Sequence, residues 1–184
     1  MRYVKKFKIF LILLVTGTVF NTFADGIRVD PSSILVDYQK GTINARYDVQ
    51  LNPTLEQALT RGIPLFFSLN CEIIQSRWYW LDKKLYSSQQ ERKLTFNPLT
   101  RSYRFYVGSV YVTYNTLDEA LQAVGQVSSW ALGEANLLKK NETYQATLQL
   151  KLDVSQLPKP FQIDAIANND WNLSSSPYQW TLKP

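Results

Sequence analysis

The sequence predicts a mainly β, α+β fold: an antiparallel β-sheet or β-sandwich with two short packed helices. Several segments alternate apolar and polar residues with a period of two, which is typical of strands with one buried and one solvated face. Two other segments carry helix-start signals, and they do not alternate with the strands as a parallel βαβ fold requires. About 160 residues follow an N-terminal leader, a length that suits one domain with one core.

Residues 1–24 are predicted to be a Sec-type signal peptide, which leaves 25–184 as a single β-rich domain. Four basic residues precede an apolar run at 9–15, and Thr22 and Ala24 are the small residues that signal peptidase requires before its cut. Polar residues interrupt the run well short of the roughly 20 apolar residues of a spanning helix. We expect export through Sec to the periplasm; the alternative is an uncleaved leader that tethers the domain to the inner membrane.

The apparent basicity of the chain belongs to its leader. The chain contains 20 Lys and Arg against 15 Asp and Glu, for a net charge of +5 and an isoelectric point near 9.2. Arg2, Lys5, Lys6 and Lys8 lie in the leader, and removing them leaves 16 basic against 15 acidic residues, or +1. A nucleic-acid binder would need a basic stripe on the folded domain. We expect no nucleic acid among the partners, and a membrane contact only if the leader is retained.

The strand pattern is clearest in two segments, 43–51 and 144–152, in which every second residue is apolar. The segment 103–114 alternates too, but its phase slips by one residue at Gly108-Ser109, which predicts a bulge or a tight turn. Shorter strand candidates lie near 27–38, 78–86, 91–96, 161–167 and 178–183.

Two helices are predicted between the strands. The first spans 52–62, where a capping Asn and a first-position Pro open the helix and a Gly closes it. The second opens at Thr116 with Glu119 three residues later, the spacing of a capping box. Its apolar stripe continues to Val127, which predicts an end near Gly133. The sheet topology is left open by these patterns.

The only cysteine, Cys71, lies on the same face of a predicted strand as Leu69 and Ile73. On such a face a cysteine usually acts as a small buried hydrophobe. Cys71 has no partner for an internal disulfide, and lipid attachment would need a cysteine directly after the leader, where Asp25 stands. We predict that Cys71 is buried and structural; an intermolecular disulfide is the alternative.

The sequence lacks the residues that most catalytic and metal sites need. It has no histidine, which excludes Ser-His-Asp and Cys-His catalysis and histidine-ligated zinc, and one cysteine cannot hold a thiolate cluster. No glycine-rich nucleotide-binding motif is present. We predict a non-enzymatic protein without cofactor or metal. The alternative is an envelope hydrolase that cleaves a glycan with two carboxylates drawn from Asp118, Glu119, Asp153, Asp164 and Asp170.

The most distinctive string is the Arg-Trp-Tyr-Trp-Leu-Asp segment at 77–82. Its tryptophans, Trp78 and Trp80, share one face of a strand and either pave a flat surface for a glycan or a protein or belong to the core. The core is favoured, because large aromatic side chains supply much of the burial in a modest domain. Two prolines at 157–162 predict a rigid, extended connection. The candidate interaction surface consists of Arg77, Trp78, Trp80, Asp82, Arg101 and Arg104.

Six ordered strings run along the chain. They are Gly-x-Pro-Leu at 62–65, Arg-Trp-Tyr-Trp at 77–80, Leu-Thr-Arg-x-Tyr-Arg at 99–104, Leu-x-Glu-Ala-Leu at 117–121, a proline-bearing segment at 152–162 and Trp-x-Leu-x-Ser at 171–175. In this order they resemble a family of exported bacterial proteins known as domain of unknown function 4390. The resemblance covers nearly all of the chain after the leader, and several ordered strings are more specific than any single one.

The resemblance implies export from a proteobacterial cell, with no assigned activity and no catalytic residue. Members of the family are often encoded beside a membrane sensor kinase and its response regulator, which implies an accessory role in envelope sensing. We therefore expect a non-enzymatic binding or interaction module of the cell envelope whose partner is an envelope protein or a glycan. A structural factor in envelope assembly is a further alternative.

Overall fold

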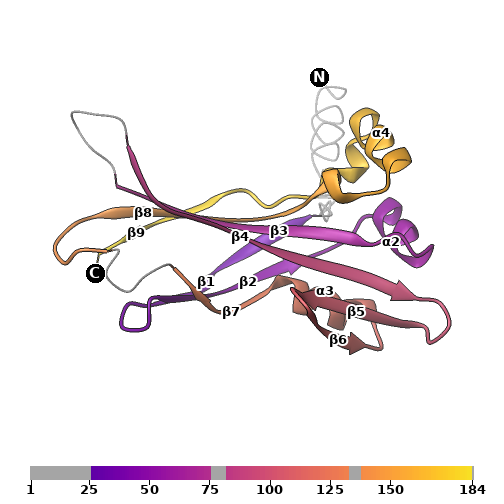
Figure 1. Cartoon of the computed structure of the whole chain (residues 1–184), viewed down its shortest axis with the longest axis horizontal. Helices are drawn as coiled ribbons and strands as arrows, with labels where there is room; N and C mark the ends of the chain where they lie inside the picture. The colour runs from indigo at the N-terminus through magenta and orange to yellow at the C-terminus, as the bar shows by residue number, and fades with distance from the viewer. Residues whose placement is uncertain (1–25, 76–81, 133–137, 184) are drawn as a thin grey trace, which may run out of the picture.

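The computed structural model describes residues 26–75, 82–132 and 138–183, and these form two antiparallel sheets. The smaller sheet has the strand order β1-β2-β7, and the larger has the order β6-β5-β4-β3-β8-β9. Figure 1 shows the two sheets as the two layers of a sandwich, which confirms the predicted mainly β fold. The strands are β1 (Ile27–Asp37), β2 (Thr42–Val49), β3 (Leu65–Gln75), β4 (Lys83–Asn97), β5 (Ser102–Val107), β6 (Val110–Tyr114), β7 (Gln126–Ala131), β8 (Tyr144–Leu152) and β9 (Tyr178–Leu182).

The core lies between the sheets, where the inward faces of β2, β3 and β8 meet. The alternation that predicted these strands is confirmed, because every second residue of each is buried. Burying one large apolar side chain contributes roughly 1.5–3 kcal/mol, so this layer is the main source of stability. Cys71 is a free, buried thiol in the middle of it, as predicted. The inward residues of β3 are Leu65, Phe67, Leu69, Cys71 and Ile73.

Helix α2 (Pro53–Thr60) forms where the sequence predicts it. The Asn52 side chain accepts a hydrogen bond from the Leu55 N–H, and Pro53 stands in the first turn, where no N–H donor is needed. Gly62 adopts a φ of +88°, a conformation that favours glycine, and this turns the chain into β3. The helix buries Leu55, Ala58 and Leu59.

Helix α3 (Leu117–Gly125) begins at the predicted capping box. Thr116 accepts a hydrogen bond from the Glu119 N–H, and the Glu119 carboxylate accepts one from the Thr116 N–H. Asp118 and Glu119 also place negative charge at the positive end of the helix dipole. The helix turns Ala120, Leu121 and Val124 toward the core.

The predicted end of the second helix near Gly133 is wrong, because α3 stops at Gly125 and the chain continues directly as β7. Gly125 lies so close to β2 that a Cβ there would be 2.1 Å from the Tyr47 carbonyl oxygen. The helix therefore ends where it meets the smaller sheet. Val127, the last residue of the predicted stripe, is buried as a residue of β7 instead.

A third helix, α4 (Lys159–Ala167), replaces both the strand predicted near 161–167 and the extended connection predicted at 157–162. Both predictions are wrong for the same reason. Pro160 lies in the first turn of the helix, where a missing N–H leaves no bond unmade, so the prolines start a helix instead of preventing one. Short 3-10 turns flank this helix: η1 (Val154–Gln156) and η2 (Asn169–Trp171).

Two predicted strands merge, and one predicted slip becomes a turn. The candidates near 78–86 and 91–96 belong to the single strand β4 from Lys83 onward, and residues 78–81 lie outside the described residues. The slip at Gly108 is confirmed as a tight turn, since β6 folds back on β5 directly after it. Gly108 has a φ of +60°, as the first central position of a type II′ hairpin turn requires.

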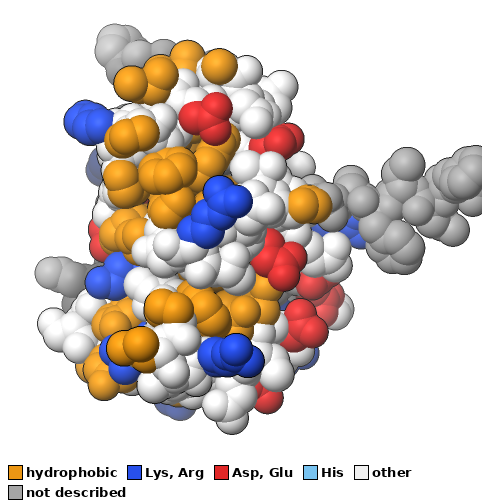
Figure 2. Space-filling view, turned by 90° about the vertical axis from the view of Figure 1, so that its right-hand side faces the viewer, with side chains coloured by type: hydrophobic (Ala, Val, Ile, Leu, Met, Phe, Trp, Pro, Cys, Tyr) orange, Lys and Arg blue, Asp and Glu red, His pale blue; other side chains and the backbone are white. Residues whose placement is uncertain are grey.

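One end of the molecule gathers α2, α4 and the β4–β5 turn, and it shows hydrophobic side chains interleaved with charged ones (Figure 1 and Figure 2). The exposed fractions are 94% for Leu99 in that turn and 70% and 88% for Ile163 and Ile166 in α4. No residue of α4 is buried. This helix therefore contributes little to the core.

Candidate functional site

Each sheet ends in two edge strands, whose outward backbone N–H and C=O groups can pair with another chain. These edges are β1 and β7 in the smaller sheet and β6 and β9 in the larger sheet. Natural sheets block such edges with proline, charge or breaks in register. Within the described residues, three of the four edges carry such a block.

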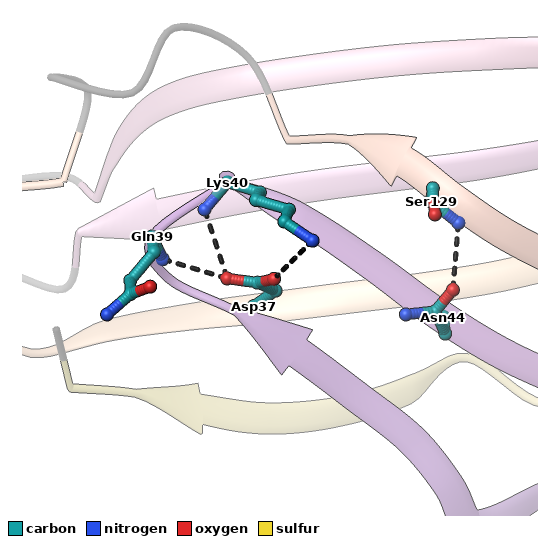
Figure 3. Close-up of polar contacts among 5 residues, drawn as sticks. All are labelled: Asp37, Gln39, Lys40, Asn44 and Ser129. Carbon is teal, nitrogen blue, oxygen red and sulfur yellow. Dashed lines mark hydrogen bonds and ion pairs between the residues drawn. The ribbon is translucent and has the colours of Figure 1, made fainter.

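Strand β1 is blocked by a proline and an irregular stretch. Pro31 lies inside the strand, and the pairing of β1 with β2 is broken around it. Beyond the break, Asp37 closes the turn into β2 by accepting hydrogen bonds from the N–H groups of Gln39 and Lys40, each at 3.0 Å (Figure 3). The Lys40 ammonium lies 3.8 Å from the same carboxylate. A strand laid along β1 would meet a discontinuous ladder.

Strand β7 is blocked by a local kink. Ser129 adopts a φ of +48°, and the pairing of β7 with β2 shifts between Ile43 and Ala45. The Asn44 side chain fills the break by accepting a hydrogen bond from the Ser129 N–H at 2.8 Å (Figure 3). The kink bends this edge away from a regular ladder.

Strand β6 has the same length as β9, five residues, but lacks its blocks. Pro177 directly precedes β9 and Lys183 directly follows it. Both strands lack proline and charge within them and pair without a break, but β6, which reads Val-Tyr-Val-Thr-Tyr, is flanked by the uncharged Ser109 and Asn115. The exposed fractions of Val110 and Val112 are 71% and 50%. These residue types favour strands strongly, so β6 is a regular and open edge.

The turn before β6 decides which of its backbone groups are free. Val107 and Val110 close a two-residue hairpin. In the alternating pattern of an antiparallel pair, the backbone hydrogen bonds to β5 are therefore made by Val110, Val112 and Tyr114. The N–H and C=O groups of Tyr111 and Thr113 therefore point away from β5. No strand of the described residues pairs with β6 on that side. These four groups are the ones that a further strand would bind.

A cavity of about 640 Å³ lies between this edge and α3. Figure 1 shows α3 beside the β5–β6 hairpin, so the helix forms one wall and the hairpin the other. Val112 lies opposite Phe105 in the pairing of β6 with β5, and a strand added to β6 would continue this inward row toward the cavity. Polar side chains make up much of the cavity lining, which consists of Phe105, Thr113, Tyr114, Asn115, Glu119, Gln122, Ala123 and Gln126.

The outer face of the same hairpin carries a stack of aromatic and basic side chains. The Lys93 ammonium lies 4.3 Å from the centre of the Tyr106 ring, and the Tyr106 and Tyr111 rings are 5.2 Å apart. The guanidinium carbon of Arg104 lies 5.5 Å from the Tyr111 ring centre. Such contacts hold cations over aromatic faces. The open edge therefore has a positively charged outer side and an apolar inner side.

Helix α3 is anchored to the larger sheet by a buried arginine. Arg92 is 3% exposed and lies on the inward face of β4. Its Nη1 donates to the carbonyl oxygens of Val124 and Gln126 at the C-terminal end of α3, and its Nε and Nη2 donate to the Gln90 side chain at 3.1 and 2.8 Å. Burial lowers the pKa of Arg92 to about 10, which leaves the side chain charged at neutral pH. A cation at this end complements the helix dipole.

The interior between the sheets raises the pKa of two buried acids, Cys71 and Tyr47. Burial raises the pKa of the Cys71 thiol to about 12, and the Glu72 carboxylate adds to the rise. Burial, and then the nearby Cys71, raises the pKa of Tyr47 above its usual range. The Tyr47 hydroxyl is buried without a hydrogen-bond partner among the described residues. A thiol with a raised pKa is a poor nucleophile, so Cys71 belongs to the core.

The structure separates the predicted surface residues. Arg77, Trp78 and Trp80 lie outside the described residues, so the choice between core and surface for the tryptophans stays a prediction. Asp82 is exposed just before β4. Arg101 is exposed in the β4–β5 turn with a φ of +50°. Arg104 is the predicted residue that reaches the open edge, through its contact with Tyr111.

The candidate carboxylates mostly serve local structure. Asp118 and Glu119 begin α3. Burial draws the pKa of Asp153 upward, but hydrogen bonds from Ser155 and Gln156 outweigh it and hold this pKa below its usual range. The general acid of a glycosidase needs the opposite shift.

The two remaining carboxylates hold the C-terminal helix in place. Asp164 accepts a hydrogen bond from the Trp171 indole at 2.8 Å, and Asp170 accepts one from the Thr54 hydroxyl at 2.9 Å. Among the described residues, no three His, Cys, Asp or Glu side chains gather as a metal site would require.

The sequence reasoning missed the open edge itself. The alternation at 103–114 predicts that Tyr111 and Thr113 lie in a strand, but their position at the margin of a sheet depends on strand order. Lys93 and Tyr106 become neighbours of Tyr111 only through the register of β4, β5 and β6. The available signal was an uncharged, proline-free run of strand-forming residues after a Gly-Ser turn.

The architecture defines a mainly β protein with two antiparallel sheets and, among the described residues, three α-helices. The chain belongs to the family described as domain of unknown function (DUF4390), which it matches over residues 24–181. No curated protein and no solved structure matches the chain. In the part of the chain that the structure describes, no helix is both long and apolar enough to span a membrane.

Proposed function

We propose that this protein is an exported binding module of the cell envelope, and that it captures an extended segment of a partner protein by adding it to β6 as a strand. One observation carries the proposal: among the four edges of the described sheets, β6 is the regular edge with no proline or charged residue in it or directly beside it. Strand addition gives affinity through backbone hydrogen bonds and specificity through pockets for alternate side chains. Tyr111 and Thr113 offer the backbone groups, and the cavity beside α3 offers the pocket.

The proposed role is non-enzymatic and favours a protein partner over a glycan. The sequence has no histidine, and Asp153, Asp164 and Asp170 accept hydrogen bonds that serve the local fold. Outward backbone groups along a strand repeat with the spacing of another strand, which a sugar does not match. These features support a peptide ligand.

The proposed location is the periplasm, with the partner among envelope proteins. The leader at 1–24 supports export, and the resemblance to proteins encoded beside sensor kinases makes an envelope sensor one partner to test. Mass spectrometry of the protein recovered from the periplasmic fraction should show a chain that begins at Asp25. Recovery of the uncleaved chain in the membrane fraction would support the tethered alternative instead.

The binding proposal is tested with a displayed library of random dodecapeptides and the protein purified after export. We expect the enriched peptides to bind the native protein and to differ in residue type between odd and even positions, because alternate side chains of an added strand face opposite sides of the sheet. Thr113→Pro should weaken their binding at least tenfold, because it removes an outward N–H while leaving the bonds from β6 to β5. Thr113→Val is the matched control, since it keeps the N–H and removes only the hydroxyl.

The outcomes separate strand addition from its rivals. Peptides that bind Thr113→Pro as well as the native protein would overturn docking at β6. Sedimentation provides the second test. A dimer that dissociates in Thr113→Pro but not in Thr113→Val would assign the edge to a second copy of this chain and would also overturn capture of a different protein.

A further inference from the structure

We infer that the segment captured at β6 is an acidic amphipathic strand, with carboxylate side chains on the outer face beside Arg104 and apolar side chains on the inner face beside Val110 and Val112. The inference rests on the proposed strand addition and names the chemistry of the ligand.

Arg104 is placed to receive a carboxylate at the edge. It lies opposite Thr113 in the pairing of β5 with β6, so a residue added opposite Thr113 would continue the same outer row. The guanidinium extends over β6, as its position 5.5 Å from the Tyr111 ring centre shows. The guanidinium therefore lies over the one strand that separates β5 from an added neighbour.

The hydrogen bonding of Arg104 is incomplete. Its Nε is buried and has no hydrogen-bond partner among the described residues. A buried donor without an acceptor is unfavourable, and a carboxylate is the acceptor that matches a guanidinium best, through two parallel bonds. Because this Nε is enclosed, the Arg104 side chain would have to turn toward an added carboxylate opposite Thr113 to donate to it.

The rest of the outer face strengthens the same preference. The Lys84 ammonium, also on β4, is paired with Glu72, and the Lys40 ammonium is paired with Asp37, whereas Lys93 rests on the ring of Tyr106. Lys93 and Arg104 thus add positive charge on two adjacent rows of the hairpin, Lys93–Tyr106–Tyr111 and Arg104–Thr113. Acidic residues at alternate positions of an added strand would face these rows.

The inner face of the edge strand itself favours apolar residues. Val110 and Val112 are 71% and 50% exposed on this face, opposite Val107 and Phe105 of β5. A strand whose alternate side chains are apolar would cover this surface. Positions that face outward are acidic and positions that face inward are apolar, which gives the alternation of the ligand.

The test uses three blocked nonapeptides in which valine alternates with glutamate, threonine or lysine. We expect the glutamate peptide to bind the exported protein roughly tenfold more tightly than the threonine peptide, and the lysine peptide to bind most weakly. Arg104→Gln should remove the preference for glutamate without weakening the threonine peptide. Arg101→Gln removes an exposed arginine from the neighbouring turn and should leave the preference intact.

The peptides distinguish failure of this inference from failure of strand addition. Equal binding of the glutamate and threonine peptides, both lost in Thr113→Pro, would overturn the acidic ligand and leave strand addition standing. A preference for glutamate that survives Arg104→Gln would also overturn the role of Arg104. Binding of every peptide to Thr113→Pro as to the native protein would overturn the strand addition on which the inference rests.

Discussion

The two edges of the larger sheet treat their neighbours differently. Pro177 directly precedes β9 and Lys183 directly follows it. Before β9 begins, Ser174 already pairs with Lys151 of the neighbouring strand β8 in an isolated bridge. β6, at the other edge, is regular from Val110 to Tyr114 and stands beside a cavity. Both strands are five residues long, so length does not explain the contrast.

The contrast shows where this fold resists pairing and where it permits it. An unblocked edge exposes a protein to aggregation, and natural sheets usually remove that exposure. Here the blocks occur at β1, β7 and β9, and the edge without one is the edge flanked by a helix. The unblocked edge β6 therefore lies beside α3, and this helix can restrict which segments bind there.

The largest expected effect comes from displacing α3, the helix beside β6. Gly125→Ala places a Cβ where the Tyr47 carbonyl oxygen already lies within 2.1 Å, so α3 must move away from β2. We expect a loss of about 3 kcal/mol in the free energy of unfolding, measured in urea, together with weaker peptide binding. Gln126→Ala, one residue along, should change stability by less than about 0.5 kcal/mol. Native stability in Gly125→Ala would contradict the close approach.

The next effect comes from the arginine that anchors α3. Arg92→Met leaves the carbonyl oxygens of Val124 and Gln126 without their donor in the core. We expect a loss of about 2 kcal/mol in the free energy of unfolding, as for hydrogen bonds to a charged group. Arg101→Met alters an exposed arginine and should be nearly neutral. If the two variants were equally stable, Arg92 would not be an anchor.

The interior shared by both sheets should be sensitive to alkali. The pKa of Cys71 is raised by burial from 9.0 to about 12, so above pH 9 the unfolded chain loses a proton that the folded chain keeps. Stability is therefore fully present below pH 9 and falls by up to about 1.4 kcal/mol per pH unit as the pH rises toward 12. The contribution of this thiol is isolated by measuring the free energy of unfolding of the native protein and of Cys71→Ala between pH 9 and pH 10. If that free energy changed with pH equally in the two proteins, the raised pKa of Cys71 would be refuted.

The smallest effect concerns the block on β7. Asn44→Ala removes the acceptor of the Ser129 N–H, whose hydrogen bond is 2.8 Å long. We expect a loss of roughly 0.5 kcal/mol and faster hydrogen exchange at the Ser129 amide, measured by NMR. Asn44→Asp keeps an acceptor oxygen and should keep the slow exchange. An unchanged exchange rate in Asn44→Ala would mean that the Ser129 amide is protected without the hydrogen bond to the Asn44 side chain.

The sequence was sufficient for features that depend on near neighbours. The caps at Asn52 and Thr116, the alternation on β3 and the turn at Gly108 all lie within a few residues of their causes. The burial of Cys71 followed from the same alternation. Local patterns therefore predicted the fold class and most strands.

Features that depend on distant contacts could not be predicted in this way. The end of α3 is set by the Tyr47 carbonyl group of another strand, and the helix at 159–167 depends on prolines placed at its start. The open edge is a property of strand order, which no local pattern encodes. Arg104 was a candidate because of its string, but its orientation toward β6 comes from the contact with Tyr111.

The direct passage from α3 into β7 has a mechanical consequence. No connecting residue separates Gly125, the last residue of the helix, from Gln126, the first of the strand. A force that tilts the helix is transmitted to the smaller sheet without a compliant joint to absorb it. Arg92 of the larger sheet donates hydrogen bonds to carbonyl oxygens at the same junction. Because α3 is joined to the smaller sheet by the chain and to the larger sheet by Arg92, a displacement of the helix would involve both sheets.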